Sequence, residues 1–315
     1  MYRKAIILGI KGTKLSNDEK LILKQGKPWG IILFSRNISN LTQLSSLIND
    51  IKFIIKDKNY PIIIDEEGGK VSRLKKIIDL SLFSQNYFAN IYKKDKKNFY
   101  HIYKIYIDTV SNIFNKVGIN INTVPVLDIY RSSSHSIIGN RSFSNDPKIV
   151  TEMGNHCIAL FKKNKIATVM KHIPGHGMAK SDSHYKTSII TSNKKDLINK
   201  DFKPFKKCQT FFAMTAHLVY KSFDEKYTAT HSSIIINEVI RNIIGFKGIL
   251  ISDDISMKAL KFSLKENAIK ALDSGCNLVL HCNGNTGEMR KLLKIVPTID
   301  KFTQKKTSLF YNFLG

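Results

Sequence analysis

Short apolar runs rich in β-branched residues alternate along this chain with longer amphipathic stretches. Eight of the runs have the length and composition of strands that are buried on both faces, as in a parallel sheet. They cover residues 5–8, 31–34, 61–64, 121–127, 166–170, 211–215, 248–251 and 278–280. The sequence therefore predicts a largely parallel sheet.

The stretches between these runs have the periodicity of helices that bury one face. In the clearest, apolar residues recur three and four positions apart, at Ile102, Ile105, Tyr106, Val110, Ile113, Phe114 and Val117. Further helices are expected at about 40–56, 146–163, 193–207, 232–244, 264–273 and 288–295. Each predicted strand is followed by a predicted helix or by a loop that leads to one.

Eight β–α units in 315 residues favour an α/β fold of the closed (β/α)₈ TIM-barrel type. No linker rich in Pro, Gly or Ser divides the chain, so residues 1–315 are expected to form a single catalytic domain. An open, doubly wound sheet is the alternative, but no G-x-G-x-x-G pattern follows the first strand.

Polar residues of chemically useful types lie just beyond the ends of the predicted strands. They are Asp65, Asp128, Lys171, His172, His217, Asp253 and His281. In a (β/α)₈ barrel the carboxyl ends of all strands open onto one face, where catalytic residues collect. These side chains are therefore candidates for a common site.

The composition excludes several classes of protein. The chain is 43% hydrophobic, as globular proteins are. Its net charge is +25, but the basic residues are spread along the chain rather than clustered or interleaved with aromatic residues, which disfavours a nucleic-acid partner. The first apolar run ends at Lys11, and no membrane span is visible. Four cysteines without framework spacing predict an intracellular protein rather than a secreted disulfide-rich one.

Residues 65–73 place three carboxylates beside two glycines and end at Arg73. Such a set suits hydrogen bonding to adjacent hydroxyls of a sugar. For Glu66 and Glu67 an acidic helix start is an equally good interpretation. Asp65, which follows a strand directly, is assigned to the site.

Residues 171–184 combine Lys171, His172 and His176 with the sequence Asp182-Ser183-His184. Pro174, Gly175 and Gly177 exclude a helix, and with it a zinc helix. A zinc site made of His172, His176, Asp182 and His184 stays open as an alternative. The other interpretation is a loop in which Asp182 orients His184 for proton transfer.

Two further segments carry candidates. Asp253 and Asp254 are adjacent at a strand end, where neighbouring residues point to opposite sides, so Asp253 is assigned to the pocket and Asp254 to a supporting role. Arg141 lies in Gly139-Asn140-Arg141-Ser142-Phe143, where a solvated surface arginine is an equally good interpretation.

These blocks together resemble family 3 of the glycoside hydrolases, in particular its single-domain bacterial β-N-acetylglucosaminidases of cell-wall recycling. Residues 171–184 are similar to the family's Lys-His-Phe/Ile-Pro-Gly-His-Gly and Asp-Ser-His loop, and residues 65–73 to its Asp-x-Glu-Gly-Gly-Arg-Val-x-Arg block. Residues 139–143 and 252–258 resemble its Gly-x-Arg-Ser-Phe and Ser-Asp-Asp-Leu-Ser-Met-Lys blocks. Lys70 and Ile173 depart mildly from the family pattern.

The resemblance implies a retaining exo-β-N-acetylglucosaminidase that acts on muropeptide fragments in the cytoplasm. Asp253 would be the nucleophile, and His184 paired with Asp182 the general acid/base. The residues implied to bind N-acetylglucosamine are Asp65, Arg73, Arg141, Lys171 and His172. No cofactor, metal, nucleic acid or membrane partner is implied, and a monomer is expected. A family 3 β-glucosidase, a zinc hydrolase and a polyanion-binding protein are the alternative functions.

Overall fold

The computed structural model describes residues 2–131, 138–179 and 187–315. Eight strands, every neighbouring pair parallel, close into a barrel in the order β1-β10-β9-β7-β5-β4-β3-β2. They are β1 (Lys4–Gly9), β2 (Pro28–Leu33), β3 (Ile62–Ile64), β4 (Ile121–Asn122), β5 (Ala167–Ile173), β7 (Phe212–Thr215), β9 (Ile249–Asp254) and β10 (Leu278–His281). The predicted (β/α)₈ barrel is confirmed, and the open doubly wound sheet is wrong.

All eight predicted strands are present, but three boundaries differ in a way that affects the site. β4 is only two residues long because Pro125 has no N–H to donate to the ladder, and pairing resumes at a bridge between Val126 and Lys171. β5 and β9 are longer than predicted. Lys171, His172 and Asp253 therefore lie within the last three residues of their strands rather than beyond them.

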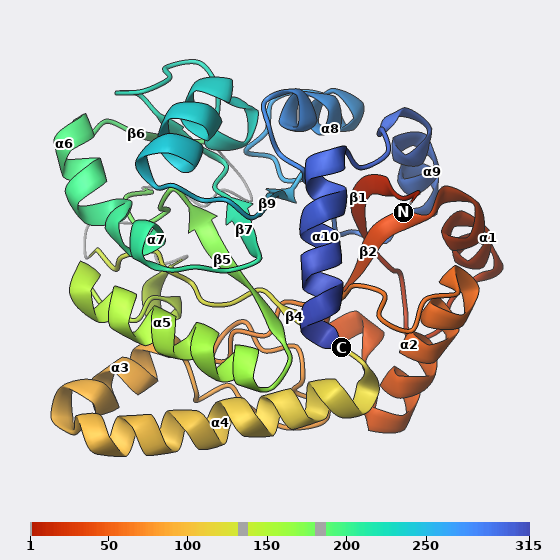
Figure 1. Cartoon of the computed structure of the whole chain (residues 1–315), viewed down its shortest axis with the longest axis horizontal. Helices are drawn as coiled ribbons and strands as arrows, with labels where there is room; N and C mark the ends of the chain where they lie inside the picture. The colour runs from red at the N-terminus through yellow and green to blue at the C-terminus, as the bar shows by residue number, and fades with distance from the viewer. Residues whose placement is uncertain (1, 132–137, 180–186) are drawn as a thin grey trace.

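Helices surround the barrel, and Figure 1 shows α4 and α5 side by side on its outside. The helices are α1 (Asn17–Gly26), α2 (Leu41–Ile55), α3 (Gln85–Lys94), α4 (Lys96–Val117), α5 (Pro147–Lys163), α6 (Lys194–Asp196), α7 (Lys203–Lys207), α8 (Leu264–Asp273), α9 (Thr286–Ile295) and α10 (Lys301–Leu314). The helix predicted at 193–207 is divided into α6, a π-helical turn and α7, and the one predicted at 232–244 is π-helical over Ile235–Ile243. None of the described helices combines the length and the apolarity that crossing a bilayer requires.

Three helices were not predicted, although their first turns carry recognisable signals. Ser16 and Glu19 form a reciprocal capping box at the start of α1. Ser84 and Asp300 cap α3 and α10 through their side chains. A short parallel pair, β6 (Ser188–Ile190) with β8 (Leu218–Tyr220), was also missed and lies outside the barrel.

The last helix closes the amino end of the barrel. α10 lies over the middle of the barrel in Figure 1. Several of its contacts are with residues at or next to the starts of strands. Trp29 Nε1 donates to Thr307 Oγ1 (2.9 Å), and Arg3 Nη1 donates to the Tyr311 hydroxyl (2.8 Å). Arg3 also pairs with Asp57. The carboxyl ends of the strands are thus left to form the functional face.

Candidate active site

A pocket of about 200 Å³ opens at the carboxyl ends of the strands. This volume is below the roughly 300–1,000 Å³ that is usual for drug-sized ligands, so the pocket suits a small one. Among its lining residues are six of the predicted site residues, Asp65, Arg73, Arg141, Lys171, His172 and Asp253. The structure thus brings together side chains that are up to 188 positions apart in the sequence.

Asp182 and His184 lie outside the described residues, so the structure gives no geometry for the predicted acid/base pair. The chain that leads toward them is described as far as Ala179, and His176 within it lines the pocket. His176 was part of the sequence motif but was not assigned to the site.

Asp65 is the acceptor for two cations on the pocket wall. Arg73 Nη2 and Lys171 Nζ each pair with one of its oxygens at 2.5 Å, and the Thr123 hydroxyl also donates to it. Burial by itself raises the pKa of Asp65, but Lys171 and Arg73 outweigh it and hold the pKa well below its ordinary value. Asp65 is therefore an anion at neutral pH.

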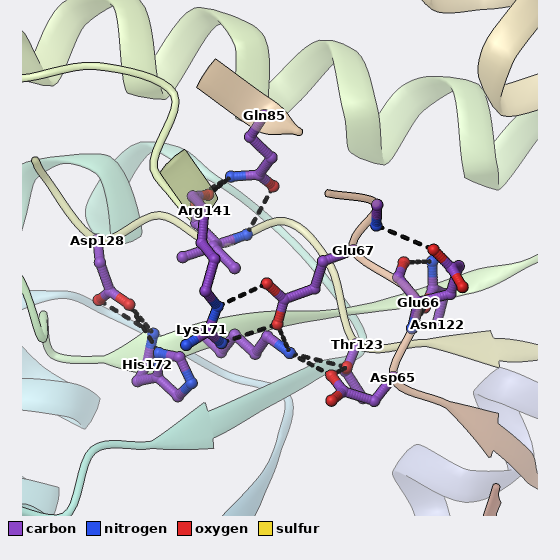
Figure 2. A network of polar contacts seen from close by, with 12 residues as sticks. Asp65, Glu66, Glu67, Gln85, Asn122, Thr123, Asp128, Arg141, Lys171 and His172 are labelled. Carbon is purple, nitrogen blue, oxygen red and sulfur yellow. Dashed lines mark hydrogen bonds and ion pairs between the residues drawn. The ribbon is translucent and has the colours of Figure 1, made fainter. Parts of the chain in front are cut away.

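Glu67 pairs with the remaining cation, Arg141, and with Lys171 as well, as Figure 2 shows. Arg141 donates to it in bidentate fashion, from Nε to Oε2 (2.7 Å) and from Nη2 to Oε1 (2.8 Å), and Lys171 Nζ lies 2.5 Å from Oε1. Burial opposes ionisation, yet Arg141 and Lys171 keep the pKa of Glu67 below its ordinary value. The interpretation of Arg141 as a solvated surface residue is wrong, because only 13% of its side chain is exposed.

Glu66 organises the loop that carries Asp65 and Arg73. Its carboxylate accepts hydrogen bonds from the amides of Gly68 (3.0 Å), Arg73 and Leu74 (2.9 Å). Burial raises its pKa to about 7 despite these donors. The acidic helix start considered for Glu66 and Glu67 is wrong, since the segment is a loop.

The two glycines of this loop have a conformation that other residues rarely adopt. Gly68 and Gly69 have φ angles of +76° and +61°. A Cβ on Gly68 would also lie 2.3 Å from the carbonyl oxygen of Phe83. Glycine at this position therefore lets the loop fold tightly against the segment before α3.

Asp128 fixes the orientation of His172. Its Oδ2 accepts from His172 Nδ1 (2.6 Å), and its Oδ1 accepts from the backbone amides of His172 (3.2 Å) and His176 (2.6 Å). Because Nδ1 donates to the carboxylate, the Nε2 atom of His172 remains for the pocket, which this residue lines. Burial and the neighbouring His172 lower the pKa of His176 to about 4, so His176 is neutral at neutral pH.

Asp253 and Asp254 both line the pocket, so the expectation that only Asp253 reaches it is wrong. The supporting role expected for Asp254 is nevertheless present, since its Oδ1 accepts from the amides of Ser256 (3.0 Å) and Cys282 (3.3 Å). Burial raises the pKa of Asp253, but His217, His172 and the amide of Asp254 together bring it below the ordinary value. Asp253 is therefore an ionised carboxylate inside the pocket.

His217 contacts the backbone of the segment that carries Asp253 and Asp254. Its Nε2 donates to the carbonyl oxygen of Asp254 (3.0 Å), and its Nδ1 lies 2.7 Å from the Thr230 hydroxyl. His281, the other histidine that follows a predicted strand, contacts Glu288 instead (2.8 Å). Of these two histidines, only His217 is linked to the pocket through Asp254.

Sequence reasoning missed the carboxylates that pair with the predicted residues. The sequence does not decide between two interpretations of Glu67, and it predicts Asp128 only as a candidate for the common site. Their partners are 74 and 44 positions away, at Arg141 and His172. Only the closure of the barrel brings these pairs together, although the position of Asp128 after a strand was a usable signal.

The structure does not test the zinc site considered from the sequence, because two of its four ligands, Asp182 and His184, lie outside the described residues. No group of three or more potential ligands is found within 2–131, 138–179 and 187–315. His172 uses Nδ1 for Asp128. The four cysteines are free thiols, and Cys282 lines the pocket beside Asp254.

Comparison with known proteins identifies the family. The pattern of the glycosyl hydrolase family 3 N-terminal domain matches residues 3–307. The beta-hexosaminidase of Nitrosomonas eutropha is 31% identical over 288 residues, which are 90% of this chain and 82% of that protein. The beta-hexosaminidase of Actinobacillus pleuropneumoniae is 32% identical over 301 residues, which are 93% and 86% of the two chains.

Solved structures agree with this assignment. NagZ from Neisseria gonorrhoeae in complex with N-trifluoroacetyl-D-glucosamine superposes with a TM-score of 0.88 at 28% identity, covering 98% of this chain and 90% of that one. The match therefore extends over nearly the whole of this chain. The chain belongs to family 3 of the glycoside hydrolases.

Proposed function

We propose that this protein is a β-N-acetylhexosaminidase that removes terminal N-acetylglucosamine with retention of configuration. The observation that carries the proposal is the position of Asp253, an ionised carboxylate that lines the same small pocket as Asp65, Arg73 and Lys171. Carboxylate and cation pairs of this kind suit the hydroxyls of one sugar ring. The relatives named beta-hexosaminidase support the choice of the N-acetyl sugar.

In the proposed mechanism Asp253 attacks the anomeric carbon and forms a covalent glycosyl-aspartate. His184, oriented by Asp182, protonates the departing oxygen and then removes a proton from the water that cleaves the ester. The lowered pKa of Asp253 supports its part, because only the ionised carboxylate is a nucleophile. The roles of His184 and Asp182 rest on the resemblance of residues 171–184 to the family's loop.

The substrate class follows from the same resemblance. We infer muropeptide fragments in which N-acetylglucosamine is linked to 1,6-anhydro-N-acetylmuramic acid peptides, and a monomeric, single-domain enzyme of the cytoplasm without nucleic-acid or membrane partners. Four unpaired cysteines are consistent with a reducing compartment.

Hydrolysis of a chromogenic N-acetylglucosaminide, compared with the matching glucoside, tests the proposed function. We expect turnover of the N-acetyl substrate only. Preference for the glucoside would identify a family 3 β-glucosidase instead. A chelator is expected to leave the rate unchanged, and loss of activity on chelation would favour a metal-dependent hydrolase. Absence of turnover, together with binding to a polyanion that weakens steeply with salt, would identify a polyanion-binding protein.

Replacing His184 by alanine is expected to affect poor leaving groups most. Without a proton donor, the rate with an alkyl or sugar aglycone falls by about 10²–10⁴-fold, while an activated nitrophenyl aglycone leaves with little help. The measurement is kcat/KM across a series of aglycones of different pKa. His101→Ala, a change of the same kind at an exposed position on α4, serves as the control. An equal loss across the series would contradict proton donation.

A further inference from the structure

Glu67 lies behind the pocket wall rather than in it. The residue is 5% exposed and its side chain only 1%, and it does not line the pocket formed by the described residues. Its backbone is held by the loop itself, since its amide donates to the carbonyl oxygen of Val71 (2.9 Å). This hydrogen bond fixes the position of the Glu67 backbone, and with it the place from which the side chain extends.

The two cations that Glu67 contacts come from different elements. Arg141 lies on the short helical turn Gly139–Arg141, outside the strands, and Lys171 lies near the end of β5. Figure 2 shows the Glu67 carboxylate between them. One buried group thus joins a loop, a strand and a turn at the edge of the pocket.

The geometry leaves each cation little freedom. Lys171 has three N–H donors, and three acceptors surround its Nζ atom: Asp65 Oδ1, Thr123 Oγ1 (2.9 Å) and Glu67 Oε1. The bidentate contact with Glu67 fixes the plane of the Arg141 guanidinium. The backbone of Arg141 is held as well, because Gln85 Nε2 donates to its carbonyl oxygen (2.6 Å).

The Glu67 carboxylate is also needed to balance the positive charge at the pocket. Arg73, Lys171 and Arg141 are three cations that line the pocket, and Asp65 and Glu67 are the two carboxylates paired with them. Without the charge of Glu67, Lys171 would keep Asp65 as its carboxylate partner, but the bidentate carboxylate that separates Arg141 from Lys171 would be lost. Two poorly hydrated cations would then move apart or draw in water and ions.

We propose that Glu67 is a positioning residue of the sugar site, which holds Arg141 and Lys171 at the separation that the substrate's polar groups require. The inference rests on the proposed function, and it adds a residue that touches no substrate. Glutamine at this position keeps the shape but directs an N–H toward a cation, so it cannot serve both partners.

The test is a double-mutant cycle in the full chain with Glu67→Gln, Arg141→Met and the double variant. Each is assayed for kcat and KM on a chromogenic N-acetylglucosaminide and for inhibition by free N-acetylglucosamine. We expect Glu67→Gln to raise KM and the inhibition constant and to lower kcat/KM about 10- to 100-fold, as loss of a supporting partner does elsewhere. The double variant should lose less kcat/KM than the product of the two single losses, because both changes disturb Arg141, and any loss beyond that of Arg141→Met reflects Lys171.

Glu152→Gln on α5 is the matched control, since it removes the same charge from a carboxylate that accepts from Tyr92 and Tyr100 away from the pocket. Its kcat/KM should stay within about twofold of the wild-type value, as expected for a distant and independent site. If Glu67→Gln does not fold, Glu67→Asp, which keeps the charge but shortens the reach, replaces it in the cycle.

The possible outcomes separate this inference from the proposed function. Unchanged KM and inhibition constant in an active wild-type background would overturn the positioning role. The positioning role would also be overturned if the losses of kcat/KM in Glu67→Gln and Arg141→Met multiplied fully in the double variant. A wild-type protein without turnover would overturn the proposed function, and this inference with it.

Discussion

Asp253→Asn is expected to abolish turnover of an aryl N-acetylglucosaminide, with a loss on the order of 10⁴- to 10⁶-fold, the scale seen when a covalent nucleophile is removed. The amide has almost the same shape, so its oxygen can still accept from the amide of Asp254, and the barrel should remain folded. What is lost is the anion that the neighbourhood of His217 and His172 favours. The rate is measured alongside the thermal unfolding of the variant.

The control for this experiment is Asp108→Asn, the same change at a half-exposed position on α4. It should retain normal turnover. A 2-fluoro glycosyl inactivator provides an independent readout, because it traps the covalent intermediate for mapping by mass spectrometry. Near-normal rates in Asp253→Asn, or a label on Asp254 or Asp65, would assign the nucleophile elsewhere.

Asp65→Asn should reduce both activity and stability. At pH 7 we expect the free energy of unfolding to fall by about 3 kcal/mol, at the low end of the range for removing one partner of a buried ion pair. The loss arises because Arg73 no longer has a carboxylate partner in Asp65. We expect the low end of the range because Lys171 keeps its ion pair with Glu67 after the change. The measurement is urea unfolding of both proteins, with kcat/KM recorded on the same samples.

The pH dependence of this difference has a defined sign. Folding lowers the pKa of Asp65, so its ionisation stabilises the folded state above the unfolded-state pKa of about 3.9. That contribution is lost as the pH falls toward the lower pKa of the folded state. The gap between wild type and Asp65→Asn should therefore be largest near neutrality and shrink below about pH 4. A gap that stays constant between pH 7 and pH 3 would contradict this account.

The barrel could be predicted from the sequence because its strands are buried on both faces. Continuous apolar runs such as Ile62–Ile64 and Phe212–Thr215 are typical of strands that are buried on both faces of a parallel sheet. Elements at the surface were harder to predict from the sequence. α1 and α10 have few buried residues, and β6 is a three-residue strand paired only with β8, so their local signals are short.

The pocket residues were predictable for a different reason. Asp65 and Asp253 lie at the carboxyl ends of strands, where the topology of the barrel itself directs them to one face. Their partners were not predictable in this way. Whether Glu67 turns toward Arg141 or toward solvent depends on the loop conformation that Gly68 and Gly69 allow, and no periodicity reports on that.

The contacts of α10 have a practical consequence. Tyr311 and Arg3 hold the last helix and the first strand together at the amino end of the barrel, while the pocket opens at the other end. A bead, electrode or carrier protein attached close to Arg3 or Tyr311 would thus lie opposite the pocket. Immobilised material should accept bulky glycans as readily as the free enzyme does.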